Sequence, residues 1–244
     1  MEEMKMKKML VLVSVLLLSS AAMAETWDLD LDFETALTNP NGAWSYGYVQ
    51  NGVFTAYDGL VHDADISGSM RTAWRVGTDW DTYGNMQKIL EGEASFDAWT
   101  SYRYGGELCS GPGGDAAVKT IARWTCPADG SYGISAVWQG LSTKPEGTTV
   151  DVTLEKNGEI LYSGALAGFI GHDNLNYSDR HGVWEQSFSD TLNLLQNDYL
   201  DLTIACGADG QGADCTNMDL TIVPEPITMA LLGLGGMALL RRRR

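Results

Sequence analysis

The sequence contains none of the short motifs that usually mark a catalytic centre. It has no Gly-x-Ser-x-Gly nucleophile elbow, no His-Glu-x-x-His helix, no phosphate-binding loop and no dinucleotide-binding glycine fingerprint. It has only three histidines, His62, His172 and His181, which we expect in surface loops. Glycosidases use a pair of carboxylates, but in a chain with 32 acidic residues a suitable pair can always be found. Such a pair is therefore not evidence for a glycosidase. The sequence predicts a protein that is not an enzyme, with a secreted glycoside hydrolase or lyase as the least favoured alternative.

Basic residues are also scarce. The chain has 16 Lys and Arg against 32 Asp and Glu. Seven of the bases and three of the acids lie in the two terminal segments, which leaves 29 acids and nine bases between them. A field of that sign repels nucleic acid and anionic membrane surfaces, and it favours solubility and divalent cations. We therefore expect no nucleic-acid partner.

Cysteine is limited to four residues, and no Cys-x-x-Cys or His-x-x-x-His spacing of a zinc site occurs. All four lie in the part that we expect to be exported, where disulfides persist. Four cysteines allow three pairings. We favour Cys206–Cys215, which closes the loop GADGQGAD, together with Cys109–Cys126. Each bridge would contribute roughly 2–4 kcal/mol by restricting the unfolded chain.

The first 24 residues have the three parts of a signal peptide. Lys5, Lys7 and Lys8 form a basic region, and Met9–Leu18 is an apolar stretch about half as long as a membrane span. Ala22 and Ala24 supply the small residues that signal peptidase requires. We predict cleavage after Ala24 and a mature chain that begins at Glu25.

The last 22 residues form a second unusual segment. Residues 227–240 are apolar or small and span only about 21 Å as a helix, which is short for a permanent membrane anchor. The basic cluster Arg241–Arg244 would hold the C-terminus in the cytoplasm by the positive-inside rule. The segment is therefore suited to transient insertion into the inner membrane, with the preceding chain on the outer side.

Val223-Pro224-Glu225-Pro226, followed by a short apolar helix and the four arginines Arg241, Arg242, Arg243 and Arg244, resembles the PEP-CTERM sorting signal. The resemblance implies recognition by an exosortase, cleavage near the motif, and delivery to the cell surface or extracellular matrix of a Gram-negative bacterium that makes exopolysaccharide. An ordinary C-terminal anchor is the alternative. We predict three parts: a signal peptide (1–24), a folded domain (25–222) and a sorting signal (223–244).

Short alternating segments between the two ends predict an all-β fold. Residues 26–33 place apolar and acidic side chains on opposite faces, as in a half-buried antiparallel strand. Residues 130–140 and 148–163 alternate in the same way, and Asn157-Gly158 supplies a hairpin turn. Three further strands are expected around a turn at 196–198 and at 218–223. Evenly spaced short strands with many glycines predict an antiparallel β-sandwich, jelly-roll-like, flanked by the signal peptide and the C-terminal hydrophobic helix.

The segment from Leu108 to Gly140 is similar to a module that recurs in PEP-CTERM proteins, and the segment Thr216–Ile222 is similar to the last strand of galactose-binding-like jelly rolls. This second resemblance implies a structural calcium ion near the first and last strands. Asp219 matches the last-strand position, and Asp28, Asp30 or Asp32 would approach it if the terminal strands are neighbours. Asp209 and Asp214 form another acidic cluster, and a solvated acidic face is the simpler explanation of both.

Aromatic residues suggest a role in carbohydrate binding. The chain has eight tryptophans and ten tyrosines, and such rings can stack on sugars. Trp80 and Tyr83, in a loop with flanking aspartates, form the better candidate platform. Trp44, Tyr46 and Tyr48 fall on one side of a predicted strand. Trp44 and Tyr46 form a second candidate platform, for which a core-facing strand is the alternative. We predict an exported, non-catalytic surface or exopolysaccharide-associated protein that signal peptidase and exosortase process, and a module that binds a defined glycan is the alternative.

Overall fold

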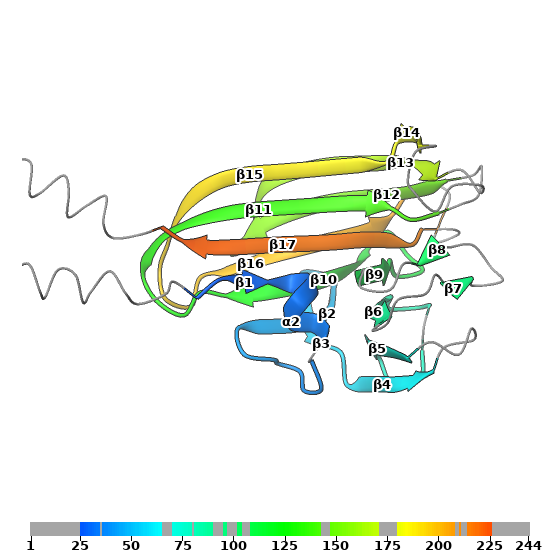
Figure 1. Ribbon diagram of the computed structural model, residues 1–244, viewed down its shortest axis with the longest axis horizontal. Helices are drawn as coiled ribbons and strands as arrows, with labels where there is room; N and C mark the ends of the chain where they lie inside the picture. Colours follow the sequence, from blue (N-terminus) through cyan, green and yellow to red (C-terminus); the bar gives the residue numbers. More distant parts are fainter. Residues whose placement is uncertain are drawn as a thin grey trace, which may run out of the picture. The chain divides into compact units, whose positions relative to one another are not determined.

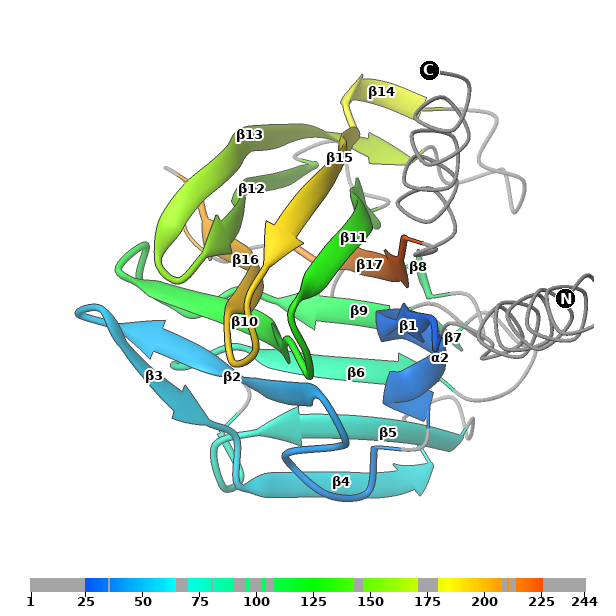
Figure 2. The ribbon, with the colours of Figure 1, turned by 90° about the vertical axis from the view of Figure 1, so that its left-hand side faces the viewer.

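Two antiparallel sheets pack face to face in the computed structural model (Figures 1 and 2). The structure describes residues 25–34, 36–64, 70–79, 81–89, 95–96, 102–103, 108–142, 147–170, 180–207, 210 and 214–225. Trp27–Ile222 form one compact unit. Among the described residues, none builds a helix with the length and hydropathy of a membrane span. The predicted antiparallel β-sandwich is confirmed.

Sheet A has eight strands in the order β15-β11-β17-β9-β6-β5-β4, with β1 also paired to β17. Their bounds are Trp27–Asp28 (β1), Gly59–Ala64 (β4), Met70–Arg75 (β5), Asn85–Ile89 (β6), Leu108–Gly111 (β9), Gly130–Gly140 (β11), Glu185–Leu194 (β15) and Thr216–Pro224 (β17). Strand β17 therefore has β11 along one edge, and its other edge is shared by β9 and β1.

Sheet B has seven strands in the order β14-β13-β12-β16-β10-β2-β3. Their bounds are Trp44–Gln50 (β2), Val53–Ala56 (β3), Val118–Thr125 (β10), Thr148–Lys156 (β12), Glu159–Ile170 (β13), Arg180–Val183 (β14) and Tyr199–Cys206 (β16). A separate hairpin pairs β7 (Ser95–Phe96) with β8 (Tyr102–Arg103). The predicted hairpin turn is confirmed, because Asn157 and Gly158 both have positive φ, as a tight two-residue turn requires.

The core lies between the sheets and is rich in aromatic rings. Trp124 on β10 contacts Trp27 at 5.2 Å and Tyr132 at 5.5 Å between ring centroids. Trp138 on β11 stacks on Tyr162 of β13 at 5.5 Å, and its indole donates to the carbonyl oxygen of Thr203. Edge-to-face and offset-stacked pairs of this kind add to the stability gained from burial alone.

The first predicted strand is wrong beyond its second residue. After β1 the chain forms a short helix, α2 (Leu29–Glu34), rather than a continuous strand. The carboxylate of Asp28 accepts the backbone N–H of Leu31 at 3.0 Å, as an N-cap does. Leu29 and Phe33 are fully buried at a spacing of four residues. Residues four apart share one face of a helix and also one face of a strand, so the spacing fits both structures. The Asp28 N-cap favours the helix.

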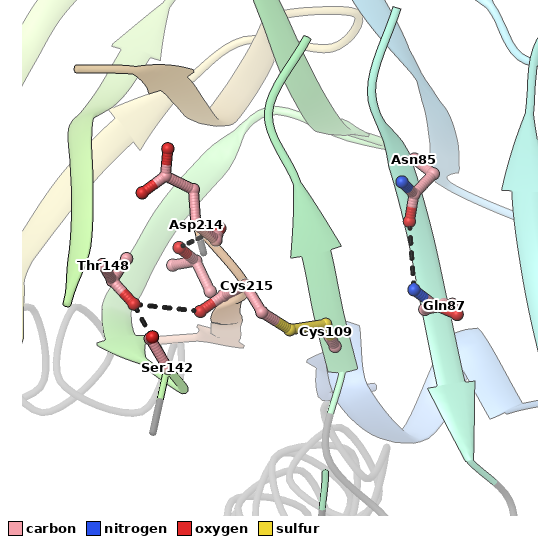
Figure 3. The surroundings of a disulfide bond; sticks show 8 residues. Asn85, Gln87, Cys109, Ser142, Thr148, Asp214 and Cys215 are labelled. Atoms are coloured by element: carbon pink, nitrogen blue, oxygen red, sulfur yellow. Dashed lines mark hydrogen bonds between the residues drawn. A yellow bond between two sulfur atoms is a disulfide. The ribbon is translucent and has the colours of Figure 1, made fainter. Parts of the chain in front are cut away.

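The disulfide pairing also differs from the expectation. Cys109 on β9 is bonded to Cys215, with Cα atoms 5.9 Å apart (Figure 3). Cys109 lies opposite Asn217 in the β9–β17 register, which brings Cys215 next to it. Cys126 and Cys206 are buried thiols at opposite ends of the paired strands β10 and β16, so neither favoured bridge forms. Pairing cysteines that are close in the sequence gave the wrong bridges, because the register of the paired strands decides which cysteines lie close together in the fold.

The bridge closes a loop of 106 residues, so its loss should destabilise the fold clearly. We expect Cys109→Ser to lower the free energy of unfolding by about 2–5 kcal/mol in non-reducing denaturant titrations. Peptide mapping should find Cys109 linked to Cys215. A Cys109–Cys126 or Cys206–Cys215 peptide, or equal stability of Cys109→Ser and wild type, would contradict the pairing.

Candidate functional site

Strand β17 leads directly into the segment that the sequence marks as a sorting signal. β17 spans Thr216–Pro224, so Val223 and Pro224 continue its extended backbone, and Glu225 is the last described residue. The remaining predicted sorting residues, Pro226 and Arg241–Arg244, lie outside the described residues, as do Ala22 and Ala24. The sandwich and the predicted signal are therefore joined without an intervening linker.

The other chain end meets β17 at the same point. Trp27 lies opposite Ile222, and Asp28 lies opposite Thr221, in an antiparallel pair. The ring of Trp27 is anchored on Trp124, as described above. The first strand after the predicted signal-peptide cleavage site, Trp27–Asp28, thus pairs with Thr221 and Ile222, the last two residues before the predicted sorting signal.

This pairing brings the predicted metal-binding aspartates Asp28, Asp30 and Asp219 into one neighbourhood. The side chain of Asp28 caps α2, and the carboxylate of Asp30 bonds to the ammonium of Lys88 at 3.0 Å. Lys88 is only 2% exposed and also donates to the backbone oxygen of Asp30 at 2.7 Å. The buried ammonium of Lys88 therefore provides the positive charge beside the Asp30 carboxylate. In the described part of the chain, no three carboxylate, histidine or cysteine side chains are grouped to hold a metal ion.

The other predicted metal-binding aspartates either accept hydrogen bonds within the fold or lie outside the described residues. Asp32 accepts the indole N–H of Trp44 at 2.7 Å. Asp214 is buried and accepts the backbone N–H of Thr149 at 2.7 Å, while Asp209 lies outside the described residues. These contacts use the acids to fix loops and strands.

Burial raises the pKa of two carboxylates in this neighbourhood, Asp30 and Asp219. The pKa of Asp219 is the one that shapes the pH test below. Burial raises its pKa to about 6, and the charges of Asp28 and Asp30 act in the same direction. The ammonium of Lys88 lowers the pKa only weakly. The folded protein therefore binds the Asp219 proton more tightly than the unfolded chain does, where aspartate titrates near 3.9.

The aromatic candidates separate into core and surface. Trp44 and Tyr46 are fully buried, so neither ring offers a face to a sugar. Tyr83 is half-buried and lies against half-buried Tyr48 on β2, with ring centroids 4.7 Å apart. The hydroxyl of Tyr57 donates to the backbone oxygen of Tyr83 at 3.0 Å and fixes that loop. Trp80 lies outside the described residues.

The loop before Tyr83 is held by a carboxylate. Asp79 accepts the backbone N–H groups of Asp81 at 2.9 Å and Thr82 at 3.0 Å. The same bonds hold the pKa of Asp79 below its usual value, because they favour the charged form. The described residues 81–84 therefore present Tyr83 beside Tyr48 on a backbone that Asp79 holds in place. The sequence grouped Tyr48 with the core-facing Trp44 and Tyr46, and the fold separates it from them.

Two contacts between an arginine and aromatic rings were not predicted from the sequence. The guanidinium of Arg123 donates to both carboxylate oxygens of Asp201 at 2.7 Å and lies between the rings of Phe54, at 4.2 Å, and Tyr199, at 3.9 Å. The guanidinium of Arg180 lies 3.7 Å from the centre of the ring of Trp184.

The predicted surface histidines are exposed where the structure describes them. His62 lies on β4 and His181 on β14, so neither is in a loop, and His172 lies outside the described residues.

Comparison with known families decides the nature of the tail. The PEP-CTERM protein-sorting motif matches residues 223–244. These residues are a PEP-CTERM sorting motif. The motif implies an exported protein that an exosortase recognises and that is sorted to the surface of a Gram-negative cell. No curated protein matches the chain.

Several solved structures match part of the chain at low similarity. A family 35 carbohydrate-binding module from Clostridium thermocellum has 12% identity and a TM-score of 0.29, and the match covers 67% of this chain and 95% of that one. The family 35 module of Cellvibrio japonicus Abf62 has 12% identity and a TM-score of 0.30, covering 56% and 84%. Rabbit GITRL has 15% identity and a TM-score of 0.28, covering 42% and 70%. At these scores the similarities give no information on ligands or site residues.

The raised pKa of Asp219 generates a test by pH. Since the folded state holds the proton more tightly, the free energy of unfolding should fall as pH rises from about 4 to about 6. Asp219→Asn should remove this part of the pH dependence and stabilise the protein at pH 7.5 by about 1–2 kcal/mol, after allowance for partial exposure. Melting temperatures over pH 4–8 measure both effects.

The exposed Asp151 on β12 provides the control for this measurement. Asp151→Asn should leave the slope between pH 4 and pH 6 unchanged. If Asp219→Asn behaves like Asp151→Asn, the carboxylate of Asp219 does not carry the predicted penalty.

Proposed function

We propose that the protein is an exported, non-catalytic component of the cell surface or exopolysaccharide matrix, delivered by its C-terminal sorting motif. In this proposal signal peptidase removes residues 1–24, the domain of residues 25–222 folds outside the inner membrane, and exosortase acts on residues 223–244. The observation that carries it is the PEP-CTERM motif, which begins where β17 leaves the sandwich.

The electrostatic character of the domain supports this role. Its 29 acids against nine bases give strong negative charge, which favours solubility and disfavours adhesion to anionic membrane surfaces. The disulfide Cys109–Cys215 suits an oxidising compartment outside the cytoplasm. Both features agree with a domain that works after export.

A glycan-binding module is the second candidate, and the pair Tyr48–Tyr83 favours it. Two half-buried rings beside a fixed acidic loop combine apolar surface with hydrogen-bonding groups, as sugar recognition requires. The proposal that Trp80 belongs to the same platform rests on its place in that loop.

Delivery is tested by removing the basic end of the motif. Replacing Arg241–Arg244 with glycines should leave the domain exported but reduce its surface fraction about tenfold or more, because the positive-inside charge that orients the tail is lost. Immunoblots of inner-membrane, surface and medium fractions from the producing cell measure the distribution. Unchanged surface delivery would contradict the sorting proposal.

Glycan binding is tested with the mature protein and the producer's own exopolysaccharide. If the platform is functional, Tyr83→Ala should weaken saturable binding by about tenfold, the loss of one well-packed aromatic contact. Trp184→Ala, which removes a half-buried ring beside Arg180, is the matched control. Equal affinity of Tyr83→Ala and wild type would exclude the platform, and no binding by wild type would leave the matrix-structural role.

A further inference from the structure

One end of the sandwich is marked by the two ends of the domain. Strand β17 leaves the fold there, and β1 enters there, because Trp27 lies opposite Ile222. Figure 1 shows the same end, on its left, with the turns that join β10 to β11 and β15 to β16, and Figure 2 looks onto it. We call this the terminal face: the β1–β17 end together with turns 126–130 and 194–198.

Hydrogen bonds between the turns make the terminal face a single surface. The backbone N–H of Gln196 donates to the carboxylate of Asp129 at 2.7 Å, and that of Asn197 donates to the backbone oxygen of Cys126 at 2.9 Å. The hydroxyl of Tyr132 donates to the backbone oxygen of Ala128 at 2.7 Å. The ring centroid of Tyr132 lies 6.1 Å from that of Trp27. The turn 126–130 is therefore linked through Tyr132 to β1, the first strand of the domain.

The terminal face exposes apolar side chains at its turns. Leu195 is 64% exposed, and Pro127 and Ala128 in the neighbouring turn are also exposed. The carboxylate of Asp198 beside them is held ionised: its pKa is lowered to about 2, chiefly by the backbone N–H of Leu195 and the side chain of Asn157. Lys156 pairs with the Asp198 carboxylate at 3.1 Å, so an ion pair flanks the fixed apolar projection. An apolar centre with a polar rim suits a protein surface, and the net negative charge of the domain disfavours an anionic lipid surface.

The length of the tether brings a partner to this face. Only four residues, Val223–Pro226, separate the last β1–β17 pair from the predicted apolar helix that begins at Ile227. A fully extended chain covers at most about 3.3–3.6 Å per residue, so the tether reaches roughly 14 Å. An enzyme that holds the sorting motif at the membrane must therefore lie within contact distance of the terminal face.

We propose that the terminal face docks onto the membrane-embedded exosortase while the motif is processed, with Leu195 as its apolar contact. This inference rests on the proposed sorting function and adds a second recognition surface to the motif itself. The exosortase then recognises the folded sandwich together with the tail. A domain in which β1 has not yet paired with β17 lacks the complete terminal face.

The test compares two exposed apolar residues at opposite ends of the sandwich. Leu195→Glu alters the terminal face, and Val183→Glu alters β14, which lies at the far end in Figure 1 and where Val183 is 49% exposed. Leu195→Glu should slow removal of the tail about fivefold or more in the producing cell, and Val183→Glu should not. The readout is the fraction of full-length chain that loses Arg241–Arg244, followed over time by mass spectrometry.

A lengthened tether provides the second arm. Inserting about twelve Gly and Ser residues between Ile222 and Val223 frees the motif from the sandwich, because such linkers behave as flexible coils. The Leu195→Glu chain with this insertion should be processed as fast as the same insertion in wild type. Equal processing of the Leu195→Glu and Val183→Glu chains, or no rescue by the insertion, would overturn the docking proposal.

The same set of variants separates this inference from the sorting function. If wild type never loses Arg241–Arg244, the sorting proposal fails, and the docking proposal fails with it. A photo-crosslinker at position 195 should capture tagged exosortase, and one at position 183 should not. Capture of lipid alone at position 195 would assign the face to the membrane surface and overturn the choice of a protein partner.

Discussion

Strand β17 is the element on which the rest of the structure depends. Cys215, one residue before it, carries the disulfide to β9, Asp219 lies at its middle near the buried Lys88, and Ile222 closes the pair with β1. On its other edge β17 pairs with β11, so it is an inner strand of sheet A. Because the sorting motif begins at Val223, the same strand that completes the fold also presents the tail.

Periodicity in the sequence was sufficient for the sandwich but not for its local exceptions. Long alternating segments such as Gly130–Gly140 gave correct strands because burial repeats every second residue. Residues 29–34 alternate equally well but form a helix, since Leu29 and Phe33 meet both periods and the Asp28 cap favours the helix. The cysteine pairing depended on the register of β9 against β17, which no local pattern contains.

The site residues show the same limit. The sequence correctly marked the tail, whose signal lies in consecutive residues, and it correctly brought Asp28, Asp30 and Asp219 together through neighbouring terminal strands. It missed that Lys88, far along the chain, supplies the cation beside Asp30. It also treated one face of β2 as uniform, although Trp44 and Tyr46 are buried and Tyr48 reaches the surface beside Tyr83.

The central claim is that this sandwich is built to be delivered by the tail that its last strand carries. The intact mass of the protein isolated from the surface of the producing cell tests this most directly. The account predicts a chain that begins at Glu25, lacks Arg241–Arg244 and contains one disulfide. A surface protein that still carries all four arginines would contradict it.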